Sequence, residues 1–172
     1  MATALCLYSI LIVGIDSQVF PSVLTQVGDS PFQQGLVLAS FFLLFPLSSA
    51  FAGLIADRTG KRIVLFFSAV FLAIPFAISA AVTLLWVRAL ALLLFGIGYG
   101  AVEAQASALL TDIHRGKERS IINLSQLFFS IGAASGPFMI SMAFNIFPAL
   151  SVQGVFWAVT AVTSTVVIGF GC

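Results

Sequence analysis

Residues 63–110 read IVLFFSAVFLAIPFAISAAVTLLWVRALALLLFGIGYGAVEAQASALL and contain two charged side chains, Arg88 and Glu103. As one helix rising 1.5 Å per residue, this run would be about 70 Å long, whereas the hydrocarbon core of a bilayer is about 30 Å thick. The run therefore predicts two membrane-spanning helices, and we expect the chain to turn back within residues 83–88. Continuous apolar sequence of this length excludes β-strands.

Further apolar stretches on both sides of this pair are long enough to cross a bilayer. We therefore expect an all-α membrane protein in which residues 1–172 form one bundle of six transmembrane helices. The second helix has the clearest start, because Ser30 can cap it, Pro31 suits its first turn and Gln33 can complete a capping box. The first span lacks the basic segment of a signal peptide, so we expect a retained helix. The expected spans are residues 4–26, 31–56, 63–81, 86–112, 121–145 and 151–171.

The composition excludes several classes of protein. Of the 172 residues, 60% are hydrophobic and 8% are charged, against roughly 25% charged in soluble domains, so the surface must face lipid. The net charge of +1 provides no basic field for nucleic acid. Cys6 and Cys172 lie at opposite ends of the chain and His114 is the single histidine. We therefore expect no disulfide framework, no metal site and no cofactor.

The positions of the basic residues predict the orientation in the membrane. Six of the seven Lys and Arg residues lie between the second and third spans or between the fourth and fifth, and Arg88 lies toward the opposite face. Loops rich in Lys and Arg face the cytoplasm. We therefore expect a multi-pass protein of a plasma or inner membrane, surrounded by lipid bilayer, with both termini in the cytoplasm.

Two carboxyl groups, those of Asp16 and Glu103, fall inside the predicted spans. Counted from the cytoplasmic ends of their helices, Asp16 lies about 18 Å deep and Glu103 about 14 Å deep. An ionisable group within a bilayer is costly and is a functional candidate by default. Because burial disfavours the charged form, we expect these two residues to bind solute and to exchange protons.

Three amide side chains inside the spans are weaker candidates for solute contact. Asn123 and Gln126 lie on one face of the fifth span. Gln18 is weaker still, because two residues along a helix turn its side chain away from Asp16. We expect Gln18 to form an interhelical hydrogen bond instead.

The most specific local pattern lies between the second and third spans. It consists of Gly53, Leu54, Ile55, Ala56, Asp57, Arg58, Thr59, Gly60, Lys61 and Arg62. It resembles the loop signature of the major facilitator superfamily, G-x-L-x-D-R-x-G-R-[KR]. The resemblance implies the N-terminal half of a twelve-helix fold, built from 3+3 inverted repeats, and conformational gating by this loop. The alternative is a charged loop that only sets the topology.

The chemistry of this loop agrees with a gating role. Gly53 permits close helix contact, Asp57 can cap the N-terminus of a facing helix, and Gly60 can form the tight turn before the third span. The resemblance further implies that Lys61 pairs with an acid at the cytoplasmic end of the fourth span, here Asp112.

Small residues mark two further patterns. Gly132, Gly136 and Pro137 resemble the G-x-x-x-G-P element of many facilitators, and they equally suit helix packing with a proline kink. Antiport is therefore not inferred from them. In the fourth span, Gly96 and Gly100 recur at helical spacing and let another backbone or a ligand approach closely.

The segment Gly98-Tyr99-Gly100-Ala101-Val102-Glu103, together with Asp16 in the first span, resembles the proton symporters for fucose, galactose and glucose. In those proteins the two acids serve substrate recognition and proton coupling. The Asn-Pro that often follows the glutamate is Ser107-Ala108 here.

The sequence thus predicts a secondary transporter, or half of one, that moves a small polar solute such as a sugar by proton-coupled alternating access. We expect a second six-helix half as partner, either a second copy or a missing C-terminal half. The alternatives are proton-driven efflux of amphipathic compounds and a non-transporting membrane module that binds a partner. An enzyme is not expected, because the sequence at Ser135 departs by one residue from the G-x-S-G of rhomboid-type proteases and His114 lies in a loop.

Overall fold

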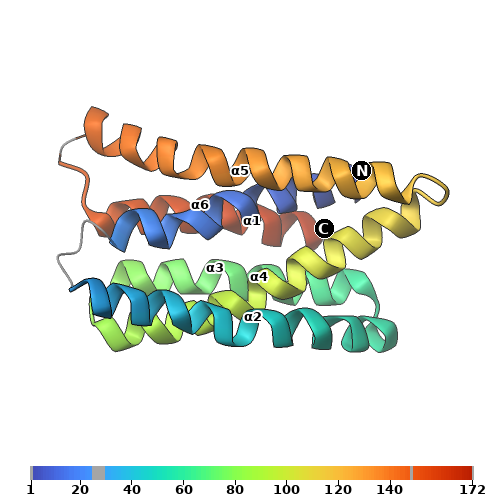
Figure 1. Cartoon of the computed structure of the whole chain (residues 1–172), viewed down its shortest axis with the longest axis horizontal. Helices are drawn as coiled ribbons and strands as arrows, with labels where there is room; N and C mark the ends of the chain where they lie inside the picture. The colour runs from blue at the N-terminus through green and yellow to red at the C-terminus, as the bar shows by residue number, and fades with distance from the viewer. Residues whose placement is uncertain (1, 25–29, 148, 172) are drawn as a thin grey trace.

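The computed structural model describes residues 2–24, 30–147 and 149–171, and the regular structure in these residues is helical. Figure 1 shows an elongated bundle in which α5 and α2 form opposite edges and the other helices lie between them. Each helix is long and apolar enough to cross a membrane, so the predicted six-span fold is confirmed. The helices are α1 (Ala2–Leu24), α2 (Pro31–Thr59), α3 (Lys61–Ala81), α4 (Leu85–Ile113), α5 (Glu118–Ile146) and α6 (Val152–Gly171).

Several helices extend beyond the expected spans at the end that carries the charged loops. Helix α2 continues to Thr59, α3 begins at Lys61 and α5 begins at Glu118. Hydropathy marks the part of a helix that lies in hydrocarbon, whereas a helix can continue into water with charged residues. The expected end of the first span at residue 26, like Cys172, lies outside the described residues.

The turn between α3 and α4 is shorter than expected. It occupies residues 82–84, so Arg88 lies inside α4 and not in the connection. The Arg88 side chain is almost fully buried. It lies in the first turn of α4, at the end away from the charged loops. A charge in a sequence suggests a boundary, but a long side chain can also be enclosed by neighbouring helices, and the pattern alone does not distinguish the two cases.

The start of α2 has the predicted capping box. The Ser30 hydroxyl accepts a hydrogen bond from the backbone N–H of Gln33, at 3.4 Å. In return, the Gln33 side-chain oxygen accepts one from the backbone N–H of Ser30, at 3.0 Å. These bonds satisfy backbone donors that a helix N-terminus leaves without an intrahelical partner.

Glycine pairs bring α1 and α5 into backbone contact. A Cβ atom built on Gly132 would lie 2.2 Å from the Leu11 carbonyl oxygen, and one built on Gly14 would lie 2.3 Å from the Phe129 carbonyl oxygen. Gly136 extends this contact by one turn, since its Cβ would lie 3.0 Å from the Ile15 carbonyl oxygen. The small residues of α5 therefore pack against α1, with Pro137 next along the helix.

A similar contact joins α4 to α2. A Cβ atom on Gly96 would lie 2.6 Å from the Phe41 carbonyl oxygen, and one on Gly100 would lie 2.4 Å from that of Phe45. If the bundle is divided into the units α1–α3 and α4–α6, the first helix of each unit packs closely on the second helix of the other. This exchange is the arrangement expected for inverted repeats.

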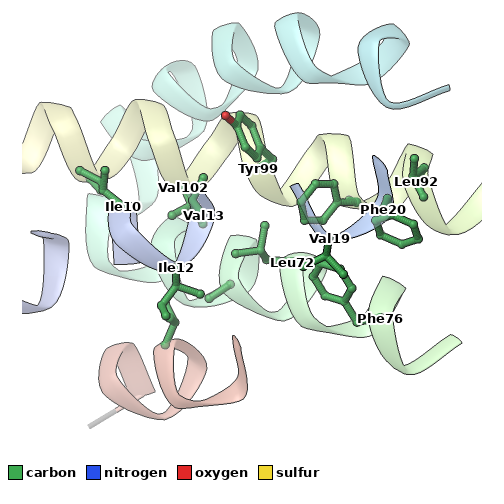
Figure 2. Close-up of a cluster of buried hydrophobic side chains, with 14 of the residues drawn as sticks. Ile10, Ile12, Val13, Val19, Phe20, Leu72, Phe76, Leu92, Tyr99 and Val102 are labelled. Carbon is green, nitrogen blue, oxygen red and sulfur yellow. The ribbon is translucent and has the colours of Figure 1, made fainter. Parts of the chain in front are cut away.

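The bundle centre is filled by aromatic rings from four helices. Phe20 of α1 stacks on Phe76 of α3, with ring centroids 5.2 Å apart, and lies 5.2 Å from Phe156 of α6. Phe95 of α4 contacts both Phe20 and Phe76. Figure 2 shows Phe20 and Phe76 among the branched aliphatic side chains that complete this core.

Gly60 connects α2 to α3 as a single residue and has a φ angle of +93°. We expect Gly60→Ala to destabilise the fold by about 1–3 kcal/mol, because side chains other than glycine strain this backbone conformation. Gly35→Ala is the matched control, since Gly35 lies inside α2 and a Cβ there would meet no atom within 4 Å. Unfolding in mixed detergent micelles, followed by circular dichroism, measures both. Equal midpoints for the two variants would contradict strain at Gly60.

Candidate functional site

A cavity of about 410 Å³ opens between α1, α2 and α4, with α5 at one side. Its wall is mostly aromatic, and polar groups from α1 lie at its margin. The residues that define it best are Gln18, Phe20, Phe41, Phe95, Tyr99 and Phe129. Concave, largely apolar sites with few polar groups are typical of small-molecule binding.

The rings around the cavity hold one another in place. The Phe41 ring meets the Tyr99 ring edge to face at 5.2 Å, and lies 5.6 Å from the Phe95 ring. Tyr99 also contacts Phe129 of α5, at 6.4 Å between ring centroids. Such an arrangement provides flat apolar faces on which the ring of a solute can stack.

Gln18 supplies an amide at this cavity. Its Nε2 atom donates a hydrogen bond to the Ser17 hydroxyl at 3.2 Å, and Ser17 donates to the Gly14 carbonyl oxygen at 2.7 Å. The expected interhelical hydrogen bond of Gln18 is not found among the described residues, where its bond stays within α1. Its side-chain oxygen and second N–H can therefore serve a bound solute.

Asp16 lies on the opposite side of α1, away from the cavity. Its side chain is buried, and its Oδ2 atom accepts a hydrogen bond from the Thr163 hydroxyl of α6 at 2.9 Å. Within the described residues, Oδ1 has no hydrogen-bond partner. Asp16 thus joins α1 to α6 and is not among the residues that line the cavity.

Glu103 lies one helical turn after Tyr99 on α4 and is partly exposed. Its carboxyl is close enough to Tyr99 to interact with it electrostatically. No hydrogen bond joins Glu103 to Asp16 in the part of the chain that the structure describes. Neither acid is among the residues that line the cavity. Glu103 lies one turn from Tyr99, which does line it, whereas Asp16 is buried against α6.

The other predicted solute contacts lie outside this cavity. Asn123 and Gln126 are exposed on α5 and are not among the lining residues. They belong to a face of α5 that no other described helix covers.

The predicted pairing of Lys61 with Asp112 is present. The Lys61 Nζ atom forms an ion pair with Asp112 Oδ2 and also donates to the Ala108 carbonyl oxygen at 3.3 Å. Arg62 Nε donates to the Phe170 carbonyl oxygen at 3.3 Å, near the end of α6. This loop therefore ties α3 to both α4 and α6.

The remaining loop residues make fewer contacts. Asp57 and Arg58 are exposed, and neither forms a hydrogen bond or ion pair with another described residue. The expected capping of a helix N-terminus by Asp57 is thus not seen within the described chain. Gly53 faces α4, where a Cβ would lie 4.0 Å from Gln105 Nε2.

Sequence reasoning missed Thr163 and the aromatic cavity wall. Thr163 is one of several hydroxyl residues in α6, and nothing in the sequence separates it from them. The 18 phenylalanines are spread along the chain, so those of the cavity show no pattern. Among residues 2–24, 30–147 and 149–171, no three His, Cys, Asp or Glu side chains are placed to hold a metal ion.

Comparisons with known proteins agree with this architecture. The family described as Major Facilitator Superfamily matches residues 4–171. The chain is also similar to a tetracycline resistance protein, class C, from Escherichia coli, with 31% identity over 129 residues. That match covers 73% of this chain and 32% of the relative, so the chain spans about a third of the relative's length. The match along nearly the whole chain shows that the protein belongs to the major facilitator superfamily.

Proposed function

We propose that this chain forms one wall of a membrane transporter that exports amphipathic solutes in exchange for protons. The main support for this proposal is the aromatic cavity with Gln18 at its margin. A solute with a flat apolar body can stack on the rings of Phe95 and Tyr99, and its polar edge can bond to the Gln18 amide.

Export of an amphipathic compound fits the cavity better than uptake of a sugar. A sugar carries hydroxyl groups on every side, and each one that loses water needs a new hydrogen-bond partner. The cavity wall offers few such partners besides Gln18, Ser17 and Tyr99. The resemblance to a protein named for tetracycline resistance supports the same solute class and an outward direction.

The transport path requires a second wall. In transporters built from internal repeats, solute binds at the interface between the halves, and rocking exposes it to each side in turn. The uncovered face of α5, with Asn123 and Gln126, is suited to face that second half. We propose that a second copy or a C-terminal six-helix half supplies it.

The charged residues have separate proposed roles. Glu103 exchanges a proton beside the cavity, and its deprotonated form favours solute binding. The ion pair between Lys61 and Asp112 closes one end of the bundle, and Asp57 and Arg62 contact the second half as that end opens. Figure 1 shows that the α2–α3 and α4–α5 loops share this end, which we assign to the cytoplasm because basic loops remain there.

Binding of tetracycline to the chain in nanodiscs tests the proposed solute class. We expect Phe95→Ala and Gln18→Ala to weaken binding by up to about tenfold each, because an aromatic contact or a hydrogen bond typically contributes about 0.5–1.5 kcal/mol. Asn123→Ala is the matched control, since Asn123 is exposed and lies outside the cavity, and it should bind tetracycline normally.

Flux measurements test transport itself. Proteoliposomes with an acidic interior are expected to accumulate tetracycline when both halves are present. Proteoliposomes with an alkaline interior, which would drive a proton symporter inward, are expected to show no accumulation of galactose. Galactose uptake without tetracycline binding would instead support a sugar symporter. Tetracycline binding that never produces flux, even with a second half present, would favour a non-transporting module.

A further inference from the structure

A second cavity, of about 350 Å³, lies on the outer surface of the bundle between α2 and α3. We call it the α2–α3 groove, and it is separate from the solute cavity. Its floor is formed by Ala52, Val64 and Ala101, which are nearly inaccessible to solvent. Its walls include Phe51 and Phe67, which are 58% and 56% exposed.

The groove exists because α2 and α3 both pack on α4 and only weakly on each other. Small side chains at the floor form an apolar cluster apart from the main core, and large side chains stand on both sides. The Ser48 hydroxyl donates to the Ile97 carbonyl oxygen and holds α2 against α4 at one end of the groove. The result is an apolar furrow on the surface of the bundle.

The length of the groove matches one leaflet of a bilayer. Along α2 it runs from Ser48 to Thr59, which is roughly 16 Å at 1.5 Å per residue. This is about half of a hydrocarbon core that is about 30 Å thick. One end therefore lies near the middle of the membrane, and the other reaches the charged loop after Thr59.

A positive charge stands at the loop end of the groove. Arg58 follows Phe51 by seven residues and Ile55 by three, which places it on the groove side of α2, whereas Asp57 is rotated by about 100° from it. Arg58 is exposed, and its guanidinium has no hydrogen-bond or ion-pair partner among the described residues. The charge of nearby Lys61 is already paired with Asp112.

We propose that the α2–α3 groove binds one acyl chain of an anionic phospholipid whose phosphate contacts Arg58. The chain of a lipid in the adjoining leaflet has the required length, and its phosphate lies at the depth where the groove meets the loop. A zwitterionic lipid supplies the same chain without the net negative charge that complements Arg58. This proposal depends on the fold and the groove, and not on the identity of the transported solute.

Photo-crosslinking in nanodiscs tests the site. The full chain is reconstituted in equal amounts of dioleoyl phosphatidylglycerol and dioleoyl phosphatidylcholine, with a trace of one lipid carrying a photoreactive group on its acyl chain. Peptide mapping after irradiation locates the crosslinks. We expect the phosphatidylglycerol probe to label the groove, at Val64 and Phe67, several-fold more than the phosphatidylcholine probe does.

Variants test the contributions of Arg58 and of the apolar groove separately. Arg58→Gln is expected to reduce the excess labelling by phosphatidylglycerol about fivefold, which corresponds to roughly 1 kcal/mol for one basic side chain near an anionic surface. Ala52→Phe fills the floor and is expected to remove labelling of the groove by both probes. Arg119→Gln is the matched control, because Arg119 is an exposed basic residue at the start of α5, beside the other charged loop. It should leave the labelling unchanged.

Three results would overturn the proposal. Equal labelling of the groove by the two probes would show that Arg58 selects no headgroup. An equal effect of Arg119→Gln would show a general effect of surface charge in place of a site. Loss of both lipid labels together with a doubled protein mass in the nanodisc would show that a second copy of the chain covers the groove.

Discussion

Gly132→Ala is expected to destabilise the bundle by about 3 kcal/mol or more, the upper end of the usual cost of overpacking. The added methyl group would lie 2.2 Å from the Leu11 carbonyl oxygen and 3.2 Å from the Gly14 Cα atom. These neighbours are backbone atoms of α1, so relief requires the whole helix to move. Loss of helical signal during titration with a denaturing detergent measures the change.

The matched control and the paired variant make this prediction specific. Gly35→Ala adds the same methyl group in open space, and we expect a neutral or slightly stabilising effect from the better helix propensity of alanine. Gly14→Ala should be as harmful as Gly132→Ala, and the double variant should cost less than the sum, because the first methyl group already separates the helices. Additive effects would argue against a shared α1–α5 contact.

A second large effect is expected for Glu103→Gln, which should remove the pH dependence of solute binding. In an exporter that exchanges solute for protons, protonation of the carboxyl competes with the solute, so solute affinity should rise with pH. Coupling between two binding sites typically changes affinity by about 5–150-fold. We expect the solute affinity of the unmodified chain to differ by about tenfold between acidic and alkaline pH, and this difference to disappear in the variant. Tetracycline titrations in nanodiscs at two pH values measure it.

Asp16→Asn is the comparison that separates the two acids. Asp16 is buried and bonded to Thr163 of α6, whereas Glu103 lies one turn from Tyr99 in the cavity wall. We therefore expect the Asp16 variant to bind tetracycline with normal affinity and normal pH dependence. Its amide oxygen can still accept the Thr163 hydroxyl. Loss of the pH dependence in Asp16→Asn, with Glu103→Gln unaffected, would transfer the proposed proton site to α1.

The sequence was informative where a residue acts through a strong local rule. Hydropathy located six spans, Ser30 and Gln33 specified a capping box, and the loop pattern indicated the partner of Lys61. Each of these predictions depends on the spacing of neighbouring residues or on a loop sequence signature shared by a protein family. The same rules did not fix the helix ends, because charged residues can belong to a helix that has left the hydrocarbon.

The solute cavity was beyond prediction for a different reason. Which face of α1 meets α6 and which meets the cavity depends on packing among three or more helices. The helical spacing correctly set Gln18 and Asp16 on different sides of α1. It did not show that Gln18 borders the cavity, because that follows from the positions of Phe41 and Phe95 on other helices.

The backbone contact between α1 and α5 also bears on how the protein is made. Gly14 and Gly132 are more than a hundred residues apart, and at about 5–20 residues per second a ribosome needs of order 10 s to synthesise the chain between them. During that interval α1 resides in the membrane without its closest partner. Biosynthesis therefore includes a period in which the Gly14 surface is open to wrong helices, and a factor that shields it then would raise the yield of folded protein.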